Sequence, residues 1–317
     1  MLNAKTPGHD QTFSSLGRLQ WLGYISLCLI WGSTWLAIRV VVREVPPFQG
    51  AAMRFFLAAA ILLAPVLFRK NRWPQQDRQW NAILVLGFTM MAAPYGLLFW
   101  AEQYINSSMT AVLFSANPLV VALLTPVMMR RKVPRPAVLA LVVAFGGILY
   151  LFSSNLAISS KTLLGGLAVL GATMISAWSS VFAKKRLRDV DTLFATGMQM
   201  LIGAVGLLWA TWALESHRSA TWSEPAIGAL IFLAVVGSAA AFAIYYWLLK
   251  SMQPYQLSTI SLLVPTVAIL EGSLIGNETV SLSMLVATFV VLGSVAVALQ
   301  TDAEEGVVTL PLRDGDG

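Results

Sequence analysis

Matching residues recur through this sequence at a single spacing of 147 positions. Five landmarks in the first half each meet the same residue type in the second half: Trp31 and Trp178, Gly50 and Gly197, Trp100 and Trp247, Pro118 and Pro265, and Gly146 and Gly293. Trp and Pro are uncommon residues, so five matches without a gap indicate a tandem repeat of one unit. If that unit crosses a membrane an odd number of times, its two copies have opposite orientations.

The composition places this repeat in a membrane. Apolar residues make up 57% of the 317 residues and charged residues only 11%, whereas soluble domains contain roughly 25% charged residues. At roughly 20 residues for each spanning helix, the chain has room for about ten spans. With proline and other breakers at their ends, the predicted helices cover about residues 20–42, 47–68, 79–100, 106–129, 136–153, 162–183, 191–214, 225–248, 256–276 and 281–300.

Basic residues cluster in alternate connections between these helices. The connections after the second, fourth and sixth helices contain four each: Arg69, Lys70, Arg72 and Arg78; Arg130, Arg131, Lys132 and Arg135; Lys184, Lys185, Arg186 and Arg188. The intervening connections are poor in basic residues, which is the pattern expected if both termini are cytoplasmic. We therefore predict an all-α membrane protein with ten transmembrane helices in two inverted five-helix repeats. The repeats cover 20–153 and 162–300, between a cytoplasmic tail, 1–19, and an acidic cytoplasmic tail, 301–317.

Two stretches carry a resemblance to a known family. Residues 31–35 (Trp-Gly-Ser-Thr-Trp), followed by Arg54 and Phe55, resemble the start of an EamA-type repeat of the drug/metabolite transporter superfamily, and residues 265–278 resemble the end of its fourth helix. The aromatic-rich chain is most similar to the YddG-type amino-acid exporters. The resemblance implies a multi-pass protein of the bacterial inner membrane that works by alternating access. The halves depart from symmetry, because Leu201 stands opposite Arg54 and Arg131 opposite Glu278.

Two charged residues within the predicted spans are candidates for function, Arg54 and Glu271. A charge at the membrane centre costs roughly 2.5–3.5 kcal/mol, so Arg54 requires a partner. Glu271 is placed at a similar depth and is the predicted partner of Arg54. Arg54 either binds a substrate carboxylate or forms a structural ion pair. Glu271 either couples transport to protons or belongs to a locked salt bridge.

Pro118 and Pro265 lie near the middle of the fourth and ninth predicted helices. A proline frees the carbonyl four residues earlier, here those of Phe114 and Ser261, and kinks the helix. A freed carbonyl beside Asn117 can accept from a substrate ammonium without a buried acid. The alternative is a kink that only shapes packing or lets the helix bend during gating.

Further candidates for the cavity wall are aromatic and small polar residues within the spans. Aromatic pairs four residues apart lie on one helix face and either line an apolar cavity or pack helices together. Small hydroxyl residues favour close helix packing, with substrate contact as the alternative. The predicted substrate-binding residues, beside Arg54 and Asn117, are Trp31, Ser33, Trp35, Tyr95, Phe99, Trp178, Ser179, Phe182, Gln199, Tyr245 and Tyr246.

Several activities lack the residues they require. The only histidines, His9 and His217, fall outside the predicted helices, which disfavours a metal centre or a Ser-His-Asp site at membrane depth, and there is no phosphate-binding glycine motif. We predict no cofactor, no enzyme activity and no nucleic-acid partner, in a monomer or weak dimer surrounded by lipid. The predicted function is export of aromatic or other neutral amino acids and similar small amphiphiles. The alternatives are efflux of drugs or cations such as viologens, and a membrane-embedded enzyme or lipid-handling scaffold.

Overall fold

The computed structural model describes residues 17–66, 68–69, 73–105, 107–152, 160–275 and 282–301, with the side chains of all but 107–108, 151–152, 268–275 and 282–285. These residues form helices and no strand. The first half contains α1 (Arg18–Val42), α2 (Pro47–Leu63), α3 (Asp77–Leu86), the π-helix η3 (Gly87–Ala92), α4 (Ala93–Ala101), α5 (Ser107–Phe114), α6 (Asn117–Met129) and α7 (Arg135–Phe152). The second half contains α8 (Ser160–Arg186), α9 (Thr192–Glu215), α10 (Glu224–Ala234), the π-helix η5 (Val235–Ala240), α11 (Ala241–Ser251), α12 (Pro254–Ser258), α13 (Ile260–Ile275) and α14 (Leu282–Gln300).

Each of the ten predicted ranges contains one or more of these helices. Six stretches are long and apolar enough to cross a membrane: Arg18–Val42, Asp77–Ala101, Met109–Met129, Ser160–Arg186, Thr192–Glu215 and Glu224–Ser251. Shorter apolar helices occur at Pro47–Leu63, Arg135–Tyr150 and Val286–Gln300. The chain is therefore an all-α, multi-pass membrane protein, and the count of ten spans stays a prediction.

Local sequence signals set where several helices begin. Pro47 occupies the first turn of α2, where its missing N–H and fixed φ cost nothing. The Asp191 carboxylate caps α9 by accepting from the Phe194 N–H at 3.0 Å. The Ser223 hydroxyl caps α10 by accepting from the Ala226 N–H at 3.3 Å. At the other end of α2 the helix stops at Leu63, earlier than the predicted residue 68, because Pro65 has no N–H with which to continue the helical hydrogen bonds.

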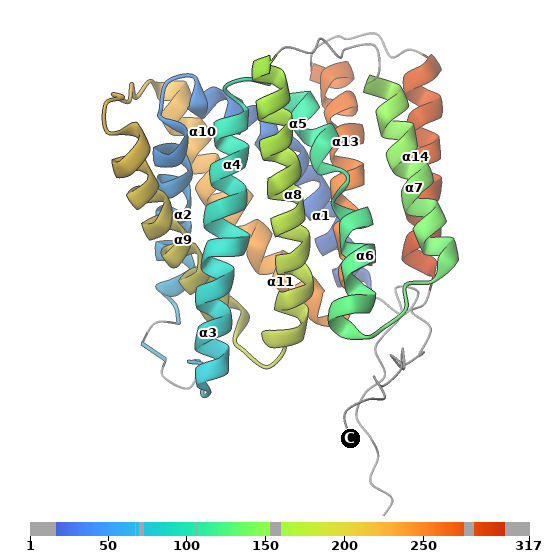
Figure 1. Ribbon diagram of the computed structural model, residues 1–317, viewed down its shortest axis with the longest axis horizontal. Coiled ribbons are helices and arrows are strands. Elements are labelled where there is room, and N and C mark those ends of the chain that lie inside the picture. The colour runs from blue at the N-terminus through green and yellow to red at the C-terminus, as the bar shows by residue number, and fades with distance from the viewer. Residues whose placement is uncertain are drawn as a thin grey trace, which may run out of the picture.

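The helix ends meet at two opposite faces of the bundle, the upper and lower faces of Figure 1. At the upper face the Thr221 N–H donates to the Glu44 carbonyl at 2.9 Å. At the lower face the Lys185 ammonium donates to the Met128 carbonyl at 3.0 Å. Thus α1, α4 and α9 end at the upper face, whereas α6, α8 and α11 end at the lower one.

Repeat-equivalent helices pack against each other at two places. Helix α2 lies along α9, and α7 lies along α14 at the right of Figure 1. Adding 147 to the start of α2 at residue 47 gives 194, within α9, and adding it to the start of α7 at residue 135 gives 282, the start of α14. In each pair the two helices run in opposite directions between the faces. The π-helices also correspond, because η3 displaced by 147 falls one residue from η5.

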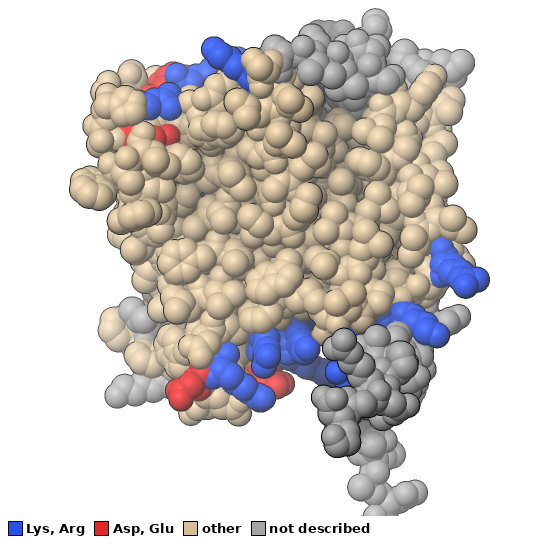
Figure 2. Space-filling model, viewed as in Figure 1, with Lys and Arg blue, Asp and Glu red and all other residues tan. Residues whose placement is uncertain are grey.

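The surface between the two faces is apolar. Figure 2 shows charged side chains gathered near the upper and lower ends; apart from one basic side chain at the right edge, the broad band between them carries none in this view. Large side chains such as Trp209, Trp212 and Phe289 are about 70% exposed there, at 68%, 71% and 71%. Because water would penalise so much exposed apolar area, this band is the part that lies in the lipid.

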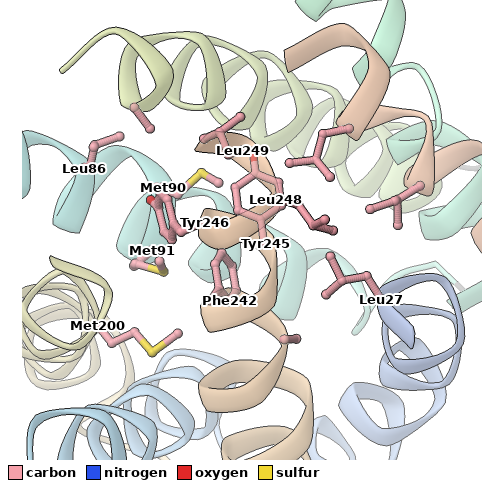
Figure 3. Packing of buried hydrophobic residues seen from close by; sticks show 14 of the residues in the cluster. Leu27, Leu86, Met90, Met91, Met200, Phe242, Tyr245, Tyr246, Leu248 and Leu249 are labelled. Atoms are coloured by element: carbon pink, nitrogen blue, oxygen red, sulfur yellow. The ribbon is translucent and has the colours of Figure 1, made fainter. Parts of the chain in front are cut away.

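Helix α11 runs through the middle of the buried core. Figure 3 shows Phe242 and Tyr245 projecting from it, with Met90 and Met91 on one side and Leu27 of α1 on the other. All five side chains belong to one continuous cluster of buried residues. This cluster therefore joins the two halves of the chain around α11.

Candidate substrate-binding cavity

A cavity lies inside the bundle, among residues of α1, η3, α4, α5, α6, α8, α11, α12 and α13. It encloses about 820 Å³, including the part open to solvent. Aromatic residues form one part of the wall: Trp31, Trp35, Tyr95, Phe114, Phe242 and Tyr245. Polar residues form another: Thr34, Asn117, Ser176, Ser180, Ser258 and Ser261. No lining residue in the described part of the chain is charged.

The aromatic rings contact one another across the two halves. The Trp31 ring centroid lies 5.6 Å from that of Phe242 and 5.6 Å from that of Tyr245. Tyr95 meets Phe242 edge-on with 6.0 Å between centroids. The Trp31–Phe242 and Tyr95–Phe242 pairs are edge-to-face, a favoured arrangement of rings, so α1, α4 and α11 present a packed aromatic surface to the cavity.

The hydroxyl wall is organised by hydrogen bonds. The Tyr245 hydroxyl donates to the Ser180 hydroxyl at 2.9 Å, and Ser180 donates to the Ser176 carbonyl at 2.9 Å. The Asn117 amide donates to the Thr173 carbonyl at 3.3 Å, which ties α6 to α8 beside the cavity. Tyr245 thus belongs to both walls, with its ring on Trp31 and its hydroxyl on α8.

Two indole N–H groups of the wall are unused. The Nε1 atoms of Trp31 and Trp35 are buried and have no hydrogen-bond partner among the described residues. A buried donor without an acceptor costs roughly 1–3 kcal/mol. The wall therefore favours a ligand that brings acceptor oxygens to α1.

Arg54 lies behind this wall and not in it. Its side chain is 1% exposed. Its Nε donates to the Ser238 hydroxyl at 2.5 Å and one terminal nitrogen donates to the Gly237 carbonyl at 2.9 Å, both within η5. The other terminal nitrogen has no hydrogen-bond partner among the described residues. The guanidinium carbon lies 4.9 Å from the ring centroid of Tyr95, a cation–π contact with a residue of the cavity wall.

The predicted partnership of Arg54 with Glu271 falls on a side chain outside those described. The described partners of Arg54 are the backbone and hydroxyl of η5 and the rings of Phe55 and Tyr95. Polar groups of a π-helix can meet the cation because this helix type leaves backbone groups out of the regular α-helical ladder. The sequence carried no signal for this contact, since a π-helix has no simple residue pattern.

Five of the predicted binding residues line the cavity: Trp31, Trp35, Tyr95, Asn117 and Tyr245. Three others form contacts elsewhere in the core. Phe99 is fully buried against the position of Gly50. Gln199 accepts from the Tyr246 hydroxyl at 2.5 Å, which joins α9 to α11 outside the cavity wall.

The remaining predicted residues also lie outside the wall. The Ser33 and Ser179 hydroxyls bond back to the carbonyls of Leu29 and Ile175, each at the preceding turn of its own helix. Trp178 and Phe182 stack on each other, with 4.8 Å between centroids and 14° between planes. All of these contacts lie within a single helix, α1 or α8, and a role for these residues in substrate binding stays a prediction.

The two prolines behave differently from each other. The fourth predicted helix is broken at residues 115–116, so that Pro118 stands in the first turn of α6. Pro265 lies inside α13, and the break of that region comes earlier, at Thr259. The Thr259 hydroxyl bonds the Gln256 carbonyl at 2.6 Å and is 2.6 Å from the Tyr24 hydroxyl, which holds the turn there.

The 147-residue offset also relates residues within the wall. Five pairs of equivalent positions both line the cavity: Tyr95 and Phe242, Leu98 and Tyr245, Ala111 and Ser258, Phe114 and Ser261, and Asn117 and Val264. Applying the offset to Tyr95 would have found Phe242, which residue type alone did not select. Helices α1 and α8 break the correspondence, because α1 supplies Trp31 and Trp35 while α8 supplies Ser176 and Ser180.

An apolar helical bundle around an uncharged internal cavity is the architecture expected of a membrane transporter. The chain belongs to the EamA-like transporter family, of the drug/metabolite transporter superfamily, whose sequence pattern matches residues 20–153 and 163–300. It is a multi-pass protein of the inner membrane.

Curated relatives agree with this assignment. The chain is 26% identical to the uncharacterized transporter YoaV of Bacillus subtilis, over 85% of this chain and 93% of that protein. It is 29% identical to the uncharacterized inner membrane transporter YedA of Escherichia coli, over 81% and 82%. A solved crystal structure matches 88% of this chain and 96% of its own with a TM-score of 0.73 at 20% identity, which shows the fold alone.

Proposed function

We propose that this transporter exports aromatic or other neutral amino acids and similar small amphiphiles by alternating access. The observation that carries the proposal is the composition of the cavity wall. Rings of Trp31, Phe114 and Phe242 suit an apolar side chain, and the hydroxyls of Ser180 and Ser261 suit a zwitterionic head group.

The two unpaired indole donors indicate how a bound substrate would be oriented in the cavity. The Trp31 and Trp35 N–H groups have no acceptor among the described residues, and Arg54 adds a positive potential from behind Tyr95. A substrate carboxylate placed near α1 would satisfy both demands. The ammonium group would then meet the hydroxyls and carbonyls beside Asn117 and Ser261, because oxygen acceptors line that side.

The architecture proposed for this transport is a pair of inverted repeats of five helices, 20–153 and 162–300, between cytoplasmic tails 1–19 and 301–317. The opposite directions of α2 and α9, and of α7 and α14, support it. So does the clustering of Arg130, Lys184 and Lys185 at the lower face, which the positive-inside rule assigns to the cytoplasm. Rocking of the halves would expose the cavity to each side in turn.

Efflux of cationic drugs is the second candidate, and the wall disfavours it. Cation sites in membranes commonly use a buried carboxylate or a carbonyl cage. No lining residue among those described is acidic, and Arg54, which contacts the wall residue Tyr95, is positive. A cation would also leave the two indole N–H groups without acceptors.

The test is efflux from liposomes that contain the purified protein, loaded in turn with labelled aromatic, aliphatic and charged amino acids and with a viologen. We expect flux of the aromatic and aliphatic amino acids above protein-free liposomes, with and without a pH gradient. Flux of the viologen alone would favour the second candidate. No flux of any amino acid would contradict the proposal.

A single substitution separates the role of the Trp31 N–H from that of its ring. Trp31→Phe keeps an aromatic ring and removes the donor, so we expect about tenfold slower efflux, the effect of losing one hydrogen bond to a charged group. Trp209→Phe is the matched control, because Trp209 is 68% exposed on the outside of the bundle. Equal rates for both variants would remove the indole donor from substrate recognition.

A further inference from the structure

A second hollow, separate from the central cavity, lies at the lower face between the ends of α6 and α8. It encloses about 970 Å³, including the part open to solvent. Five of its seven lining residues are basic: Arg130, Arg131, Lys184, Lys185 and Arg188. None is acidic. Two acids of the adjoining connection, Asp189 and Asp191, interact electrostatically with Lys250.

Helix-end electrostatics account for only part of this charge. The Lys185 ammonium donates to the Met128 carbonyl at 3.0 Å, and that of Lys184 to the Leu249 carbonyl at 2.7 Å. These two lysines compensate the carbonyl ends of helices. Arg130 and Arg188 are exposed and have no such partner in the described part of the chain. Two guanidinium groups without such partners line one hollow and therefore favour the binding of an anion. Their forked N–H donors match the geometry of phosphate oxygens.

The position of the hollow indicates where that anion comes from. It lies at the border of the apolar band, at the end of α6. Leu123 and Val127, one turn apart on α6, are 71% and 78% exposed and lead along the helix towards this end. A phospholipid could place its phosphate on the guanidinium groups and an acyl chain along α6. Neither a soluble phosphate nor a nucleotide would use the apolar part of this surface.

We propose that the hollow binds the head-group phosphate of an anionic phospholipid of the adjacent leaflet. The bound lipid would clamp α6 to α8, the helices that carry Asn117 and Ser180 of the cavity wall. It would therefore stabilise the folded transporter. This inference concerns lipid binding alone, and it holds or fails whatever substrate the cavity takes.

The experiment follows the melting temperature of the full-length protein in neutral detergent by intrinsic tryptophan fluorescence. The added probes are phosphatidylglycerol, phosphatidylcholine and inorganic phosphate, and lipid retention is checked by native mass spectrometry. At about 100 times its Kd, phosphatidylglycerol should raise the melting temperature by about 5 °C. Phosphatidylcholine and inorganic phosphate should give no comparable rise.

The double variant R130N/R188Q should lose this response and retain less lipid. Asn is chosen at position 130 because Arg130 has a left-handed backbone, with φ of 56°. The control R18Q/R78Q removes two exposed charges from the same face outside the hollow and should respond like the wild type. Equal losses in both variants, or an equal rise with phosphatidylcholine or with inorganic phosphate, would overturn the proposal. If R130N/R188Q fails to fold, the single variant R188Q should show about half the response.

Discussion

Arg54 is a buried cation within a helix of the membrane bundle, where most side chains are apolar. A lone cation at mid-membrane costs roughly 2.5–3.5 kcal/mol. Here the Ser238 hydroxyl, the Gly237 carbonyl and the Tyr95 ring each contribute to its stabilisation. The equivalent residue of the other half is Leu201, so this polar contact exists once in the chain. Arg54 therefore fixes η5 and orients Tyr95 of the cavity wall.

This role predicts a graded response to substitution. Arg54→Leu removes both hydrogen bonds to η5, each worth about 1.5–3 kcal/mol for a charged donor, so we expect at least tenfold slower efflux. Arg54→Lys keeps the charge but only one hydrogen bond to η5, and its efflux rate should fall between those of the wild type and R54L. The measurement is efflux per mole of monodisperse protein. Leu201→Met at the equivalent position is the control and should alter the rate less than twofold; an unchanged rate in R54L would contradict the role.

Helices pack closely where α9 crosses η3. A Cβ atom built on Gly203 would lie 2.5 Å from the Cβ of Met91 and 3.0 Å from the Gly87 carbonyl. One of these neighbours is backbone and cannot rotate away. The contact therefore requires glycine, and it holds the π-helix η3 against the helix that is equivalent to α2.

This geometry predicts opposite effects of two identical substitutions. Gly203→Ala should destabilise the fold by about 1–3 kcal/mol, the usual cost of overpacking. Gly228→Ala meets nothing within 4 Å and should be neutral or stabilise by up to about 1 kcal/mol, because alanine is the better helix former. Thermal unfolding in detergent measures both. A higher melting temperature for G203A than for the wild type would show that the helices separate at no cost.

The whole molecule has two unlike faces. The described residues of the lower face include the cluster Arg130, Lys184, Lys185 and Arg188. At the upper face basic and acidic groups pair, as where Arg218 lies 3.9 Å from Glu215. From the positive-inside rule we predict that the lower face is cytoplasmic.

Cysteine labelling tests this orientation directly. Cys28 is the only cysteine and is buried, so the wild type provides an unlabelled background. Arg43→Cys at the upper face should react with a membrane-impermeant maleimide in intact cells. Arg78→Cys at the lower face should react only after the cells are permeabilised, because both side chains are exposed but on opposite sides. Reaction of both sites in intact cells would contradict the predicted topology.

Much of this architecture could be predicted from sequence, because a lipid solvent leaves few choices. Long apolar stretches must be helices so that their backbone groups are satisfied internally. The 147-residue offset and the alternation of basic connections can likewise be recognised in the sequence without any knowledge of tertiary contacts. Aromatic residues at Trp31, Tyr95 and Tyr245 were sound candidates for the wall, since large rings in mid-span positions must meet a neighbour or a cavity.

Tertiary structure alone decided which of these residues face the cavity. Trp31 and Trp178 occupy equivalent positions, yet Trp31 lines the wall and Trp178 stacks on Phe182. Which side of a helix faces the centre depends on how its neighbours pack, and the two copies have diverged in that respect. The contact of Arg54 with η5 likewise joins residues 184 positions apart. The sequence by itself therefore determined the helices and their duplication, while packing between distant segments determined the chemistry of the cavity.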